Sequence, residues 1–110
     1  LSGHANKRND PFFLERAKWH LSNNRIEKSL DDLEKVQAYP ARISEHENLV
    51  RDAIYQKALG KTEVYKTTEV KSDKKKAEWA WYDVKYAYRN YQNHQHFIEA
   101  NKQIRIFAQK

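Results

Sequence analysis

Apolar residues recur at helical spacing along the first third of the chain. The stripe consists of Phe12, Trp19, Ile26, Leu30, Leu33 and Val36. Asp10 followed by Pro11 is typical of a helix start, because the carboxylate can cap the first turn and proline lacks only an N–H that has no partner there. Pro40 disfavours a helical conformation at Tyr39. The pattern therefore predicts a helix from Asp10 to about residue 37.

A polar run divides this predicted helix. Residues 22–24 read Ser-Asn-Asn, and such short polar side chains compete with the helix for backbone hydrogen bonds. We therefore expect either one long helix or two helices that separate at this run.

A second helix is predicted after residue 43. Ser44 and Glu47 have the spacing of a capping box, in which each side chain bonds to the backbone N–H of the other residue. The apolar face of this helix consists of Leu49, Val50, Ala53, Ile54 and Ala58. Gly60 stands where a left-handed residue commonly ends a helix. The prediction is a helix from Ser44 to about Leu59.

The next segment, Lys61 to Lys71, is rich in β-branched residues that roughly alternate with polar ones. That alternation suits a short strand, but a strand without a partner is marginal in water. We therefore expect an extended loop that lies over the helices, with a short strand as the alternative.

The remaining chain should be helical, beginning at a cap formed by Ser72 and Asp73. Two apolar stripes follow, in different helical phases. The first consists of Ala77, Trp81, Val84, Tyr88 and Tyr91, and the second of Phe97, Ala100, Ile104 and Phe107. A turn or kink around Gln92 to Gln95 would reconcile the two phases. The whole pattern predicts an all-α fold, a small antiparallel bundle of three to five helices with one long extended loop.

The chain length fits one domain. With 110 residues the protein can bury a single modest core. The polar residues 1–9 are expected to be a flexible arm or a remnant of expression, and residues 10–110 a single helical domain. Only 39% of the residues are hydrophobic and 13% are aromatic, so we expect a thin core that relies on aromatic rings.

Composition excludes several functional classes. The absence of cysteine rules out a thiol nucleophile, a disulfide framework and cysteine ligands for a metal. His94, His96 and Glu99 do not share one helix face, and the chain has no glycine-rich loop. We therefore predict no enzyme activity, no catalytic or metal-binding residues, no cofactor and no small-molecule substrate. No apolar run approaches the roughly 20 residues of a membrane span, and both a cytoplasmic and an exported protein fit the composition.

The most unusual feature is an aromatic-rich helix expected from about Lys76 to Tyr91. At 100° per residue, Trp81, Val84 and Tyr88 point one way, and a second group points almost the opposite way. That second group consists of Trp79, Tyr82 and Tyr86. In the simpler interpretation this is the central helix, packed on both sides. In the other interpretation the second face is exposed and binds a partner.

Lys85 and Arg89 flank the second face, which makes it suitable for binding. Tryptophan, tyrosine and arginine dominate the energetics of protein interfaces. The net charge of +6 favours acidic partners, so a partner protein with an acidic surface or a second copy of the chain is expected. Alternatively, the rings stack on nucleic-acid bases while the cations neutralise phosphates, without reading sequence. A further anion contact is predicted at Lys71, Lys74, Lys75 and Lys76. We accordingly expect a non-enzymatic interaction module.

Overall fold

The computed structural model describes residues 2–36, 40, 43–44 and 47–109, with backbone only for residues 2–9. Within these ranges the chain forms α-helices and no strands, so the predicted all-α bundle is confirmed. The helices are α1 (Ser2–Ser22), α2 (Ile26–Lys35), α3 (Asn48–Thr68), α4 (Lys71–Ala87) and α5 (Gln95–Ala108). None of them combines the length and the apolar character that crossing a lipid bilayer requires.

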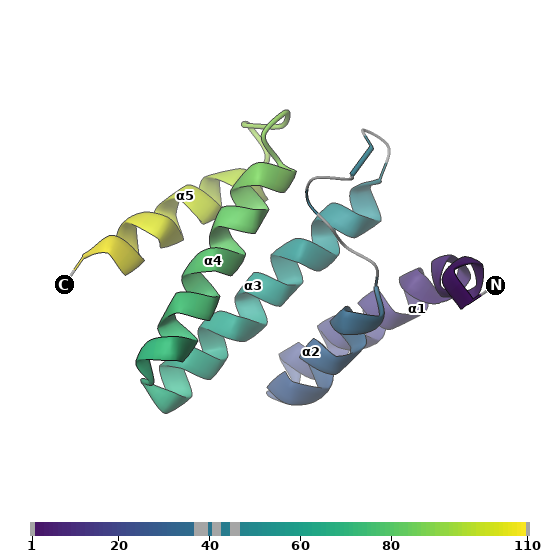
Figure 1. Cartoon of the computed structure of the whole chain (residues 1–110), viewed down its shortest axis with the longest axis horizontal. Helices are drawn as coiled ribbons and strands as arrows, with labels where there is room; N and C mark the ends of the chain where they lie inside the picture. The colour runs from purple at the N-terminus through teal and green to yellow at the C-terminus, as the bar shows by residue number, and fades with distance from the viewer. Residues whose placement is uncertain (1, 37–39, 41–42, 45–46, 110) are drawn as a thin grey trace.

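The helices are stacked as antiparallel neighbours, with α1 and α5 at opposite ends of the molecule (Figure 1). The helix pairs α1–α2 and α3–α4 form two hairpins, and α5 folds back along α4. α3 lies between α2 and α4 and contributes to two clusters of buried residues. Ala53 packs with Leu14 and Leu33, whereas Ile54 packs with Trp81 and other residues of α4 and α5. The central helix is therefore α3 rather than the aromatic-rich helix.

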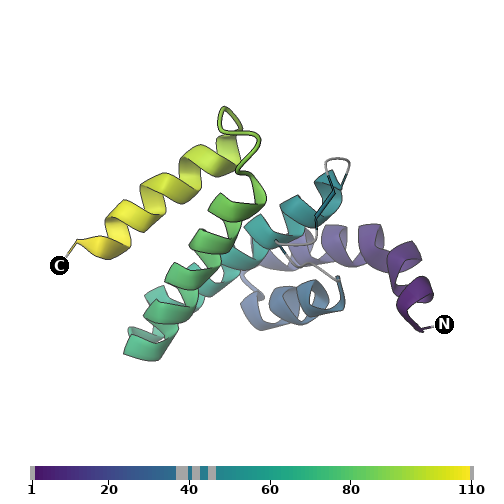
Figure 2. The ribbon, with the colours of Figure 1, turned by 45° about the horizontal axis from the view of Figure 1, so that its top comes forward.

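The first helix begins earlier than predicted. We expected it to start at Asp10, but α1 begins at Ser2 and Pro11 lies inside it. Residues 2–9, for which a flexible arm or remnant was expected, have a helical backbone. A helix can continue through a proline at the loss of one hydrogen bond and with a bend. Figure 2 shows the darkest part of α1 turned away from the axis of the rest.

Of the two alternatives for the first third of the chain, the structure has two helices that separate at residues 22–24. α1 ends at Ser22, and Asn24 adopts a left-handed conformation with φ of 61°. Asn23 Nδ2 donates to the Trp19 carbonyl at 2.8 Å, which ties the polar side chain to the last turn. The hairpin is closed by a buried hydrogen bond of 2.8 Å from Ser29 Oγ to the Ala17 carbonyl. α2 ends at Lys35, consistent with the predicted stop before Pro40.

The capping box predicted at Ser44 does not start the second predicted helix, which corresponds to α3. α3 begins at Asn48, and its N-cap residue Glu47 makes no side-chain cap bond. The Ser44 carbonyl instead accepts hydrogen bonds from the Glu47 N–H at 3.2 Å and from Arg51 Nη1 at 3.0 Å. The two inner residues of the box lie outside the described residues. A buried arginine thus supplies a tertiary contact at Ser44 that the local motif does not reveal.

The prediction that Gly60 ends this helix is wrong. Gly60 lies buried inside α3, where α2 crosses it. A Cβ atom at this position would lie 2.8 Å from Leu30 Cδ2, so the missing side chain allows the two helices to approach closely.

The extended loop or strand predicted for Lys61 to Lys71 is also wrong. α3 continues to Thr68, and Glu69, with φ of 55°, ends it in the left-handed conformation. Val70 then serves as N-cap of α4, so the predicted cap at Ser72 and Asp73 does not form. Asp73 instead accepts a hydrogen bond of 2.7 Å from Thr68 Oγ1 across the short connection.

Trp81 explains why a segment rich in β-branched residues is helical. Its indole is fully buried, and Nε1 donates to Thr62 Oγ1 at 2.7 Å. Thr62 Oγ1 in turn donates to the Ala58 carbonyl at 2.8 Å, one turn back along α3. Tyr65, about one turn further along α3, packs against the same core. Tertiary packing at both positions overrides the weak local preference of threonine and valine.

Replacing Thr62 with valine should test this contact, because valine preserves the shape of threonine but cannot accept a hydrogen bond. The indole N–H would remain unpaired in the core, so we expect the free energy of unfolding to fall by about 1–3 kcal/mol. Urea denaturation followed by circular dichroism measures this free energy of unfolding. Thr62→Ser, which keeps the hydroxyl, is the matched control and should lose less stability than Thr62→Val. Equal stability of Thr62→Val and the original protein would contradict this role.

Candidate functional site

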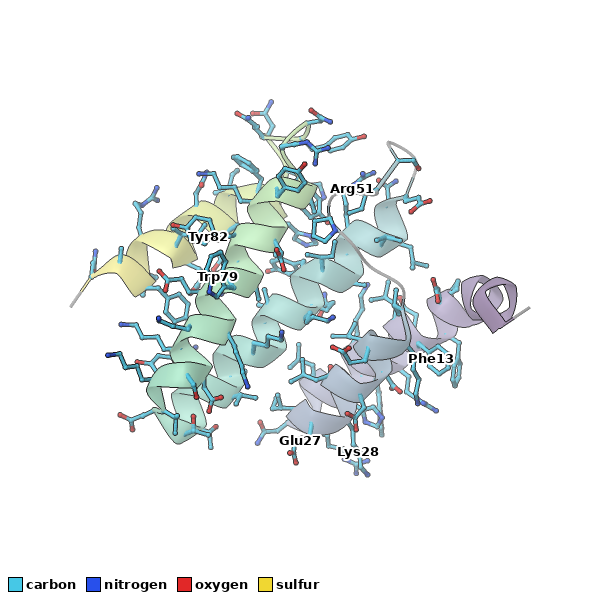
Figure 3. All side chains as sticks on the ribbon, viewed as in Figure 1. Phe13, Glu27, Lys28, Arg51, Trp79 and Tyr82 are labelled. Atoms are coloured by element: carbon cyan, nitrogen blue, oxygen red, sulfur yellow. The ribbon has the colours of Figure 1, made fainter. Side chains whose placement is uncertain are left out.

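The two faces of α4 differ sharply in exposure. Trp81 and Val84 are fully buried, as predicted for the core face. On the opposite face, 69% of Trp79, 45% of Tyr82 and 48% of Tyr86 remain exposed. We call these three residues the aromatic face; Figure 3 shows Trp79 and Tyr82 next to each other on α4. The simpler interpretation of the sequence, a helix packed on both sides, is therefore wrong.

A hollow of about 530 Å³ opens at the aromatic face. All five residues predicted to bind a partner line it, namely Trp79, Tyr82, Lys85, Tyr86 and Arg89. The sequence interpretation missed three further lining residues, Asp83, Gln92 and Phe97. Phe97 comes from α5 and is itself 8% exposed, so it forms part of the apolar floor. The apolar stripe of residues 97–107 predicted that Phe97 is buried. Its place beside the hollow depends on α5 folding back along α4, which the sequence pattern did not show.

The side chains around the hollow are ordered by contacts with each other. The Trp79 and Tyr82 rings lie 6.4 Å apart between centroids. The Arg89 guanidinium lies 4.2 Å from the centre of the Tyr86 ring, and its Nη1 donates to the Tyr86 carbonyl at 2.8 Å. Gln92 Nε2 donates to the Arg89 carbonyl at 3.2 Å. Because Arg89 is already held on the ring, binding through it loses less side-chain entropy.

The charges at the hollow are not balanced locally. Among the described residues no carboxylate forms an ion pair with Lys85 or Arg89. Asp83 also lines the hollow, and partial burial raises the pKa of its carboxyl while Lys61 and Lys57 of α3 lower it. The negative charge of Asp83 therefore interacts with the lysines of α3. The rim formed by Lys85 and Arg89 is positive.

The lysine cluster predicted to contact anions lies at the other end of α4. Lys71, Lys75 and Lys76 are exposed and Lys74 is half-buried. The rise of 1.5 Å per residue places Lys75 about 15 Å along the helix from Lys85. Lys76 lines a separate hollow of about 310 Å³ together with Lys61 and Asp73. The two predicted groups of site residues are thus not brought together.

The histidines after α4 hold α5 in place. His94 Nδ1 accepts from the His96 backbone N–H at 3.0 Å and caps α5. The His96 ring stacks on Tyr55 with 3.6 Å between centroids, and its Nδ1 lies 2.8 Å from the Tyr88 hydroxyl. Within the described ranges no group of histidine and carboxylate side chains is arranged to hold a metal ion. Their contacts bind α5 to α3 and α4, next to the hollow.

Comparison of the chain with models of known protein families, with curated proteins and with solved structures gives no match.

The exposure of Trp79 leads to a prediction about fluorescence quenching. Trp19 is 53% exposed and Trp81 is fully buried and needed by the core, so Trp19 is replaced by phenylalanine, and the Trp79 signal is the difference between this variant and one in which Trp79 is also phenylalanine. We expect iodide to quench Trp79 strongly and Trp81 hardly at all. Because Lys85 and Arg89 attract anions, iodide should quench Trp79 more efficiently than caesium does. Weak quenching of Trp79 by both ions would mean that the aromatic face is covered in solution.

His96 leads to a prediction about pH. Burial lowers the pKa of the His96 imidazole below its ordinary value of 6.5; His94 and Lys18 lower it further, and Asp52 raises it. Below pH 6.5 the unfolded chain therefore binds more protons at this residue than the folded protein does, so acid favours unfolding. We expect the free energy of unfolding to decline between about pH 7 and pH 5, above the range in which carboxylates titrate. His96→Gln should make this decline shallower, as measured by urea denaturation at several pH values across the range. An unchanged dependence of the free energy of unfolding on pH would contradict the role of His96.

Proposed function

We propose that this protein is a non-enzymatic helical interaction module that binds another protein through the aromatic face of α4, together with Lys85 and Arg89. The observation that carries this proposal is the exposure of Trp79, Tyr82 and Tyr86 beside an apolar hollow. Exposed rings grouped in this way mark binding surfaces more often than chance exposure does.

The distribution of large and small side chains on α4 supports the proposal. Three of the five buried residues of this helix are alanines, beside Trp81 and Val84, whereas two tyrosines and a tryptophan project from the opposite face. In a chain with few apolar residues, three of the largest side chains thus add little to the core. Tryptophan and tyrosine gain most when a partner buries them, since each offers a large area and few rotatable bonds.

The shape of the hollow favours a protein over nucleic acid as the partner. Phe97 forms an apolar floor into which a side chain can insert. Binding of single-stranded nucleic acid requires rings in line with a continuous positive track. Here Glu78 and Asp83 lie in the sequence of α4 between the lysine cluster (Lys71, Lys74, Lys75 and Lys76) and Lys85, so the positive charges do not form a continuous track.

A displayed peptide library tests the proposed function. We expect the protein to enrich a set of peptides, and Trp79→Ala or Tyr82→Ala to weaken their binding at least about tenfold, as truncation of an interface anchor does. Both residues are exposed, so the helical signal and the melting temperature should remain nearly unchanged. Trp19→Ala, which removes an exposed tryptophan from α1, is the matched control and should retain binding. Unfolding of Trp79→Ala, or equal loss in Trp19→Ala, would contradict the proposal.

Nucleic-acid binding is the alternative function, and salt separates the two. Oligonucleotide binding that is lost in Trp79→Ala and falls steeply as salt rises from about 50 mM would replace the proposed function with this alternative.

A further inference from the structure

We infer that the partner occupies the hollow with a short acidic segment, whose one large apolar side chain inserts against Phe97 while its carboxylates pair with Lys85 and Arg89. This inference rests on the proposed function and specifies the chemistry of the partner.

The size and the lining of the hollow indicate the apolar anchor. Its volume of about 530 Å³ lies within the 300–1,000 Å³ typical of sites that enclose a small ligand. Its lining combines the exposed rings of Trp79, Tyr82 and Tyr86 with the buried Phe97 of α5. The hollow has room for one large apolar side chain together with the neighbouring residues of an extended segment, whereas a flat folded surface would leave it unfilled. The contact is therefore with a protruding segment.

The charge on the rim indicates that this segment is acidic. Lys85 lies in the last turn of α4 and Arg89 in the turn directly after it, and both line the hollow. Neither has a carboxylate partner among the residues that the structure describes. One of the five N–H donors of Arg89 bonds to the Tyr86 carbonyl, which fixes the guanidinium and leaves donors for a carboxylate. A partner with negative charge here gains attraction at two positions.

The spacing along α4 relates the anchor to the charge. α4 rises about 7.5 Å from Tyr82 to its last residue, Ala87, and Arg89 lies two residues beyond that end, so the two residues are separated by on the order of 10 Å. An extended peptide advances about 3.3 Å per residue, so it covers this separation in about three residues. The segment should therefore have its apolar anchor about three residues from a glutamate or aspartate.

A second copy of the chain is a poorer occupant by the same criteria. Each copy has a net charge of +6, and a two-fold interface centred on the aromatic face would bring Lys85 and Arg89 of both copies into one region. A nucleic-acid strand has no large apolar side chain to insert against Phe97. The second copy therefore repeats like charges at the rim, and nucleic acid leaves the apolar part of the hollow without an anchor.

Three synthetic peptides test the inference by fluorescence anisotropy. The first has one phenylalanine with glutamates beginning three residues away, the second has alanine in place of phenylalanine, and the third has lysines in place of glutamates. We expect the first peptide to bind and the other two to bind at least about tenfold more weakly, since each loses an anchor or its charge pairs.

Two protein variants complete the experiment. The double variant Lys85→Glu/Arg89→Glu should reverse the preference and bind the lysine peptide better than the glutamate peptide. Lys74→Glu/Lys75→Glu makes the same change of charge at the other end of α4 and should bind the glutamate peptide with little loss. A loss in this control as large as in the first variant would mean that only the overall charge attracts the peptide, and would overturn the inference.

The outcomes distinguish failure of the inference from failure of the proposed function. If the displayed peptides that bind are neutral or basic, and Trp79→Ala abolishes their binding, the inference that the segment is acidic is overturned and the proposed function stands. Dimerisation by sedimentation that Trp79→Ala abolishes would assign the face to a second copy and overturn the inference. Oligonucleotide binding through Trp79 would overturn both. Absence of binding to every synthetic and displayed peptide would also overturn both.

Discussion

The structure depends on the burial of one indole. Trp81 is fully enclosed between α3, α4 and α5, and its only polar group bonds to Thr62 Oγ1. Burying this ring without a partner for its N–H would cost a large share of what its apolar area contributes. Thr62 must therefore lie opposite Trp81, which requires α3 to remain helical past Gly60. It also fixes the rotation of α4, because turning Trp81 inward turns Trp79 and Tyr82 outward. The aromatic face is thus a geometric consequence of the core.

The position of α3 explains how so few apolar residues form a stable arrangement. This helix serves two clusters at once, through Ala53 on the side of α1 and α2 and through Ile54 on the side of α4 and α5. The close approach of Leu30 to Gly60 brings α2 against the same helix. Because α3 takes the central place, α4 needs to bury only one face. The sequence suggests a central aromatic helix, and the structure assigns that role to its neighbour.

The candidate site combines features of the turn after α4 with features of the helix itself. Tyr88, His96 and Tyr55 hold α5 against α3 and α4, which brings Phe97 beneath the exposed rings. Arg89 is held on Tyr86 at the edge of the same hollow. An apolar floor, exposed rings and an ordered cation therefore occupy one small region on packed helices. Such order lowers the entropic cost of binding, and a partner with complementary charge would in addition gain electrostatic attraction to the cation.

Local pattern alone determined the helical class and the core role of Trp81 and Val84. It also indicated a weak point at residues 22–24 and an interruption near Gln92 to Gln95, although α4 ends at Ala87 rather than at Tyr91. These follow from helical periodicity and from side chains that compete for nearby backbone groups, both of which act over a few residues. Local pattern did not determine the role of Gly60, the helix over residues 61–68, the start of α3, or the exposure of the aromatic face. Gly60 alone predicts a helix end, but in the structure Leu30 of α2 packs against it inside α3. The β-branched segment alone predicts an extended chain, but in the structure Trp81 bonds to Thr62 within a helix. Contacts between residues distant in sequence decided these features, because their energies exceed the local preferences that the sequence displays.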